Sequence, residues 1–169
     1  EGHGQTDGYL TWFGGSLVWP VLAAIGYHVG GLVGTRVIAV LLSTVTLVML
    51  GQATKNVFGV KAGFWATLAF ALNGPFVALA RQGVYDVAAL MGIAVAFWAV
   101  TELCHRNHRG WLLLAAAAYA FAVFSKYPTG LMIIPLVGIL LVLRGERGVT
   151  DVPLLAFTGG AIGLAIFVP

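Results

Sequence analysis

The sequence is poor in charged residues and in cysteine. Only 9% of its 169 residues are charged, against roughly 25% in a typical soluble domain. The single cysteine, Cys104, leaves no partner for a disulfide within the chain and no cysteine-based metal site. Nucleotide-binding glycine loops, a P-loop and the nucleophile elbow of hydrolases are also missing from the sequence. These absences exclude a soluble domain, a disulfide-stapled domain and a P-loop enzyme.

Apolar residues dominate instead. They make up 60% of the chain, and 23 residues are glycine, which lets membrane helices approach closely. The mean hydropathy is +0.96. The net charge of +3 comes from basic residues in short loops between apolar runs, which is where orientation signals of membrane proteins lie. We therefore expect an integral membrane protein whose surroundings are the lipid bilayer, and we expect no nucleic-acid partner.

The apolar runs predict an all-α fold, a polytopic transmembrane helical bundle. Together with their flanking residues, the runs approach the ~20 residues that a bilayer requires. With the broken first segment they give about five to six membrane segments plus an interfacial helix. The predicted segments are Val37–Gly51, Gly63–Ala80, Val87–Leu103, Trp111–Phe124, Leu131–Leu143 and a last one from Pro153.

The first part of the chain is less regular. Residues 1–15 are polar and glycine-rich, with Glu1 and Asp7 among aromatic residues, which suits a loop at the headgroup level. Ser16–Leu32 is apolar but broken by Pro20 and glycines, so it fits an interfacial or re-entrant helix, with a full span as the alternative. Residue 1 is not Met and the last residues are still apolar, so we expect a chain truncated at both ends.

The loop charges predict an orientation. Six of the nine Lys and Arg residues lie in loops on one side, and the positive-inside rule places that side in the cytoplasm. The polar first loop, Arg36, Arg81 and Lys126 would then face outward. The six cytoplasmic residues are Lys55, Lys61, Arg106, Arg109, Arg144 and Arg147.

The stretch Asn73–Asp86 joins two of the predicted spans and places acid and base at one membrane face. Pro75 should bend the Gly63–Ala80 span near its end, and Gly83 should mark a turn, because Arg81 and Asp86 are five positions apart and would point away from each other on one helix. Glu1, Asp7 and Lys126 are predicted at the same face, so a composite site is possible.

The chemistry of these residues fits transfer from a phosphate-linked lipid donor. Asp86, with Glu1 or Asp7, could act as a general base, while Arg81 and Lys126 could hold a phosphate leaving group. Tyr85 and Tyr127 stand beside the charged positions and could line the site. The alternative is that Arg81 and Lys126 are snorkelling anchors and Asp86 a helix cap.

Metal binding has weak support. His3 could bind a metal with Glu1 or Asp7, but no two of them show a compelling ligand spacing. We assign no metal ligand, and a divalent metal remains a possible cofactor.

Several short motifs follow one another in a familiar order. They are Thr35-Arg36-Val37, Phe58-Gly59, Ala71-Leu72-Asn73-Gly74-Pro75-Phe76, Arg81-Gln82-Gly83-Val84-Tyr85-Asp86 and Phe124-Ser125-Lys126-Tyr127-Pro128-Thr129-Gly130. Their order and spacing resemble the polyprenyl-phosphate-sugar-dependent glycosyltransferases of the GT-C fold, in the branch of protein O-mannosyltransferases and aminoarabinose transferases. The resemblance covers roughly residues 30–145, and the chain departs from it at Trp19-Pro20, where the family has His-Pro-Pro.

The resemblance implies a partial transmembrane glycosyltransferase domain over residues 1–169. Residues 1–34 would form the outer loop with the interfacial or re-entrant helix, and residues 35–169 the transmembrane helices. The donor would be a dolichyl- or undecaprenyl-phosphate-linked sugar, transferred on the outer face, usually with inversion, to a protein, lipid or glycan acceptor. The resemblance places the main catalytic acid in the first outer loop, where Glu1 would be its neighbour and Asp7 a second candidate. Asp86 would match the second-loop acid, with Arg81 and Lys126 as phosphate contacts.

Two other classes of membrane protein are alternatives. A transporter or permease half also has broken helices and intramembrane polar residues, although here the polar residues gather at one face. A non-catalytic membrane scaffold would leave Arg81, Asp86 and Lys126 freely replaceable. The expected location, by resemblance, is a bacterial or archaeal plasma membrane.

Overall fold

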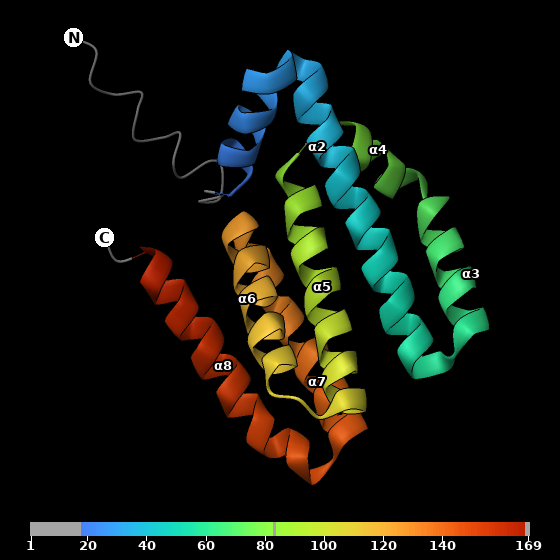
Figure 1. Cartoon of the computed structure of the whole chain (residues 1–169), viewed down its shortest axis with the longest axis vertical. Helices are drawn as coiled ribbons and strands as arrows, with labels where there is room; N and C mark the ends of the chain where they lie inside the picture. Colours follow the sequence, from blue (N-terminus) through green and yellow to red (C-terminus); the bar gives the residue numbers. More distant parts are fainter. Residues whose placement is uncertain (1–17, 83, 168–169) are drawn as a thin grey trace.

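A computed structural model describes residues 18–82 and 84–167 of the chain, without the side chains of residues 127 and 163–167 (Figure 1). Every secondary-structure element within these residues is a helix, which confirms the all-α fold class. In chain order the elements are α2 (Val18–Phe58), α3 (Val60–Ala71), α4 (Gly74–Gln82), α5 (Tyr85–Arg106), α6 (Gly110–Ser125), the 3₁₀ helix η1 (Tyr127–Met132), α7 (Ile133–Arg144) and α8 (Glu146–Phe167).

The α2 helix consists of two arms joined by a sharp break. Gly30 and Gly31 have non-helical backbone angles, and Gly31, at φ 59° and ψ −145°, adopts a conformation that only glycine reaches without strain. The first arm folds back on the second, as Figure 1 shows at the top of the molecule. The arms meet at glycine, since a Cβ at Gly34 would lie 2.0 Å from the Gly26 carbonyl oxygen. The expected interfacial or re-entrant helix is therefore a short arm packed on the next one, and its depth in the membrane stays a prediction.

The α3 and α4 helices form a bent pair where one continuous segment was predicted. Their axes differ by 62° across Leu72 and Asn73. The Asn73 side-chain oxygen accepts a hydrogen bond from the Phe76 amide at 3.1 Å, as an N-cap residue does. Pro75 then occupies the first turn of α4, where its missing N–H costs no helical hydrogen bond. The predicted bend at this proline is confirmed.

The α5 helix lies at the centre of the bundle. In its most apolar window 56% of the residues are buried, against 17% for α2. Small residues allow this close packing: Ala96 and Ala99 of α5 and Ala115 and Ala116 of α6 are all buried. Ala115 and Ala116 open a run of four alanines in α6, and both lie in the buried core. The larger members of the same core are Val100, Leu103, Leu112, Leu136, Leu140 and Leu155.

Within the described part of the chain, fewer helices are long enough to cross a membrane than the number of predicted segments. Among the described residues, α2 and α5 are long and apolar enough to cross a membrane, and the bent α3–α4 pair would be a third span. The α6 helix and the segment Pro128–Arg144 are apolar but shorter. The chain is thus an integral, multi-pass membrane protein with two or three candidate spans and shorter apolar helices. The further full spans of the predicted five to six stay a prediction.

The α8 helix starts earlier than the crossing predicted from Pro153. Gly145, at φ 56°, ends α7, and α8 runs from Glu146 with Pro153 inside it. An acidic residue in the first turn is favourable at the positive end of the helix dipole, which helps the helix to begin at Glu146.

Side-chain contacts between neighbouring helices mark the two ends of the bundle. At the lower end in Figure 1, the Asn56 amide of α2 donates to Glu102 of α5 at 3.0 Å, and Arg144 of α7 donates to the Leu103 carbonyl at 3.0 Å. The start of α5 and the end of α6 lie together at the opposite end, where Lys126 contacts Asp86. The two predicted groups of loop charges thus lie at opposite ends, while the assignment of either end to the cytoplasm stays a prediction.

Candidate functional site

The acid of the candidate site is held at the start of α5. Val84 is extended, at φ −105° and ψ 159°, and Tyr85 begins the helix, so Asp86 lies in its first turn. A carboxylate there is stabilised by the free backbone amides and the positive end of the helix dipole. Val84 is the residue at the cap position, with no side-chain cap hydrogen bond. Asp86 is therefore inside the first turn and not at the N-cap.

Lys126 is brought to Asp86 from a point 40 residues away in the sequence. The α6 helix ends at Ser125, and Lys126 follows with an extended backbone at φ −160° and ψ 111°. Its Nζ donates a hydrogen bond to Asp86 Oδ1 and forms an ion pair with it. The side chains of Lys126 and Asp86 are 35% and 25% exposed, so the pair is half-buried and still open to a ligand.

Tyr85 completes this cluster. The Lys126 Nζ lies 5.3 Å from the centroid of the Tyr85 ring, within the range of a cation–π contact. All three residues were predicted as site residues from the sequence, and the structure brings them together.

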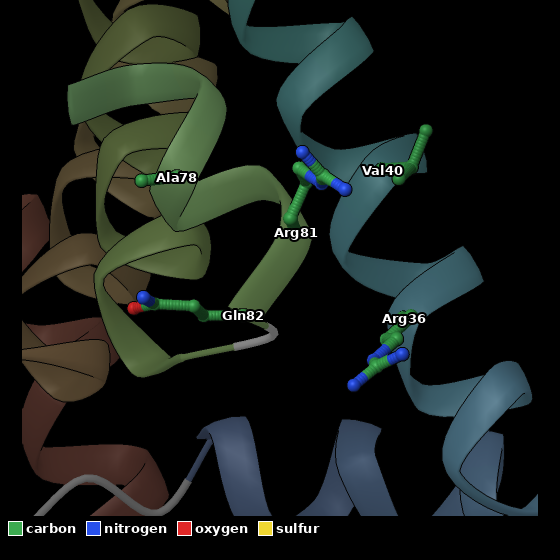
Figure 2. A pocket seen from close by; sticks show the side chains of 5 residues that line it. All are labelled: Arg36, Val40, Ala78, Arg81 and Gln82. Carbon is green, nitrogen blue, oxygen red and sulfur yellow. The ribbon is translucent and has the colours of Figure 1, made fainter. Parts of the chain in front are cut away.

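Arg81 lies near the same end of the bundle but has a different neighbour. It faces an open cavity of about 670 Å³ between α4 and α2, lined by Arg36, Val40, Ala78, Arg81 and Gln82. Figure 2 shows Arg81 and Arg36 on the two helices that border this cavity. Neither arginine takes part in an ion pair with another described residue. Two unpaired guanidinium groups at one cavity favour an anionic ligand, and their planar donors suit a phosphate.

Arg36 is the residue that sequence reasoning missed as a site residue. Its place beside Arg81 depends on α4 packing against α2. Two signals pointed to it, namely its position in the Thr35-Arg36-Val37 motif and its place among the three cations predicted at this face. Neither signal could show that it shares a cavity with Arg81.

Several predicted site residues fall outside the described part of the chain. Glu1, Asp7 and His3 precede residue 18, and Gly83, the predicted turn, lies between the described ranges. The side chain of Tyr127 is likewise not described, although its backbone begins η1. In the described ranges no three His, Cys, Asp or Glu side chains gather as metal ligands would. The roles of Glu1, Asp7 and Tyr127 stay predictions, as does the divalent metal.

A family model described as dolichyl-phosphate-mannose-protein mannosyltransferase matches residues 16–169, which is most of the chain. The chain belongs to this family. No curated protein and no solved structure matches it significantly.

Membership of the mannosyltransferase family confirms the predicted resemblance. It implies a membrane glycosyltransferase that depends on a polyprenyl-phosphate sugar. The family match also covers residues 16–30, which the sequence resemblance did not reach. It favours an enzyme over the transporter half and the scaffold.

Proposed function

We propose that this chain carries part of a glycosyltransferase site that takes a sugar, a mannose or a related hexose or pentose, from a polyprenyl-phosphate donor on the outer face of the membrane. The observation that carries the proposal is the Asp86–Lys126 ion pair beside Tyr85. It lies at the end of the bundle where Arg81 and Arg36 line an open cavity. Family membership supplies the reaction class.

The transfer needs two kinds of group. An acceptor hydroxyl attacks the anomeric carbon of the sugar and loses its proton to a carboxylate. The bond from the anomeric carbon to the phosphate oxygen breaks, and the polyprenyl phosphate leaves with the bonding electrons. Cations beside the phosphate offset the charge that develops on it.

We assign the phosphate contacts to Lys126 and Arg81, as the sequence predicted, and Asp86 to positioning Lys126. The Asp86 carboxylate is engaged by the Lys126 ammonium group, which it holds in place. The general base is then an acid of the first loop, with Glu1 and Asp7 as the candidates in this chain. Tyr85 restricts the Lys126 side chain from the other side.

The test is transfer from a radiolabelled polyprenyl-phosphate sugar by the full-length protein in vesicles, with donor concentration varied. Lys126→Ala should raise the KM for the donor about tenfold or more, since a charge-assisted contact to phosphate is lost. Asp86→Asn should also raise the donor KM, because Lys126 loses its ion-pair partner. Lys126→Arg, which keeps the positive charge, should retain part of the donor binding that Lys126→Ala loses.

Arg109→Ala is the matched control, since it removes an exposed cation at the opposite end of the bundle. Its kinetics should equal those of the wild type. If kcat alone falls in Asp86→Asn while the donor KM is unchanged, Asp86 acts on the chemical step and our assignment of its role is wrong. Unchanged kinetics in both Asp86→Asn and Lys126→Ala would contradict the proposed site as a whole.

A further inference from the structure

A second group of cavities lies at the other end of α2 and α5. An open pocket of about 480 Å³ is lined by side chains from the last turns of both helices, with Lys55 on α2 and His105 and Arg106 on α5 among them. The candidate donor site lies at the start of α5, so the length of that helix separates the two places. Nothing in the proposed transfer reaction uses this pocket.

The charges in this pocket leave cationic groups available to a ligand. Both oxygens of Glu102 are occupied, one by the Asn56 amide at 3.0 Å and the other by Arg106 Nε at 2.7 Å. His105 Nε2 donates to the Asn56 carbonyl at 3.0 Å, which fixes the imidazole ring. Lys55 forms no ion pair with any described residue. Two cations, Lys55 and Arg106, and one carboxylate, Glu102, line this pocket, so their formal charges leave it a net +1.

A groove continues from this pocket along the contact between α2 and α3. The groove has a volume of about 320 Å³ and shares Gln52, Lys55 and Val60 with the charged pocket. Its far part is lined by Val48, Gly51, Gly63, Phe64 and Thr67.

The two helices that form the groove meet at glycines. A Cβ on Gly63 would lie 2.8 Å from the Gly51 carbonyl oxygen. Val60 and Phe64, on its rim, are 68% and 61% exposed, as expected for side chains that face lipid. A cationic pocket thus opens directly into an apolar groove.

We propose that this composite surface binds one anionic phospholipid, with its phosphodiester at Lys55 and Arg106 and an acyl chain in the α2–α3 groove. A phosphodiester carries one negative charge, which matches the net charge of the pocket. Basic pockets between membrane helices are known to hold anionic headgroups. Arg106 also lies 5.6 Å from the centroid of the Trp111 ring, and tryptophan is enriched at the headgroup level. Both the charge and the depth of the pocket therefore fit a lipid of the adjoining leaflet.

The experiment measures lipids retained by the purified chain. The protein is equilibrated with equal amounts of phosphatidylglycerol and phosphatidylcholine in detergent, and the bound lipids are counted by native mass spectrometry. We expect phosphatidylglycerol to be retained at least several-fold more than phosphatidylcholine. The double variant Lys55→Ala/Arg106→Ala should lower its retention about tenfold, because two cations near the membrane surface are lost.

The matched control is Lys61→Ala/Arg109→Ala, which removes the same charge from exposed positions outside both cavities. It should retain phosphatidylglycerol like the wild type. Equal losses in the two double variants would overturn the proposal, since they would reflect net charge alone. Equal retention of the two lipids by the wild type would overturn it as well.

A second variant tests the junction of pocket and groove, and does not depend on the Glu102–Arg106 contact. Val60→Glu adds a carboxylate at an exposed position that lines both cavities, so the helix should keep its fold. It should reduce phosphatidylglycerol retention without a change in thermal stability. Unchanged phosphatidylglycerol retention in this variant would overturn the lipid assignment, because a carboxylate at this position should repel the phosphodiester. Binding of inorganic phosphate as tight as that of the lipid would also overturn it, because the groove would then contribute nothing.

Discussion

The chemistry of the candidate site depends on which side chains are paired and which are free. Lys126 has two neighbours, the Asp86 carboxylate and the Tyr85 ring, so its ammonium group is held in one place. Arg81 and Arg36 have no described ion-pair partner and share an open cavity. The Lys126 ammonium group is pre-organised, and the two guanidinium groups are available to a ligand. Binding of a phosphate-bearing ligand requires both properties.

The Asn73 side chain caps the start of α4, the helix that carries Arg81. Asn73→Ala removes the acceptor for the Phe76 amide and should lower the free energy of unfolding by about 1 kcal/mol, the usual contribution of an N-cap. Asn73→Asp keeps an acceptor at the same place and should be close to the wild type. Thermal unfolding of the two variants in detergent tests this. Equal stability of both variants would mean that the cap contributes nothing here.

At the scale of elements, the contacts between helices depend on small residues. The α5 and α6 helices approach so closely that a Cβ on Gly92 would lie 2.8 Å from the Ala118 carbonyl oxygen and 2.9 Å from the Ala122 Cβ. Within a membrane such close packing replaces the hydrophobic effect as the source of association. Asp86 lies in the first turn of α5 and Lys126 directly follows α6, so this contact also sets the geometry of their ion pair.

Gly92→Ala should therefore destabilise the bundle by about 1–3 kcal/mol, the range for overpacking a tight contact. The control is Gly138→Ala in α7, where an added Cβ meets no atom within 4 Å. That variant should be neutral or gain about 0.5–1 kcal/mol, since alanine is the better helix former. Thermal unfolding of both proteins under one detergent condition makes the comparison. A stable Gly92→Ala protein would indicate that the two helices can separate at little cost.

At the scale of the whole molecule, Arg144 connects the ends of three helices. It donates to the Leu103 carbonyl at 3.0 Å and to Asn107 Oδ1 at 2.8 Å, both at the end of α5. Its Nε also lies 3.0 Å from an Asp151 carboxylate oxygen in α8. The side chains of Arg144 and Asp151 are only 10% and 19% exposed. Removing one partner of such a pair leaves the other charge poorly solvated.

Arg144→Ala should thus cost about 3 kcal/mol, at the low end for buried pairs because Asp151 keeps some contact with solvent. The double variant Arg144→Ala/Asp151→Ala should be less destabilised, since no charge is left unpaired. Arg147→Ala, an exposed cation on the same turn, is the control and should change stability little. Chemical unfolding monitored by circular dichroism gives these values. A double variant that is less stable than Arg144→Ala would contradict this explanation.

The sequence by itself determined the class of the molecule and the identity of most candidate residues. A low fraction of charged residues and long apolar runs predict a helical membrane protein, because backbone N–H and C=O groups in lipid must form their hydrogen bonds within the segment. Local chemistry was equally predictable, as the bend before Pro75 shows. The order of short motifs gave the family, which the family match confirmed.

Only the tertiary structure decided which of these residues meet. Asp86 and Lys126 are 40 residues apart, and no local pattern records that α5 and α6 pack closely enough to join them. Arg36 shares a cavity with Arg81 for the same reason, because α4 returns to the side of α2. The lengths of the helices could not be predicted from the sequence either. Hydropathy identifies apolar residues, but it does not show that turns at Gly30, Leu72 or Lys126 interrupt the helices. Contacts between side chains on different helices depend on distances that helix packing sets, and the order of residues in the sequence does not contain these distances.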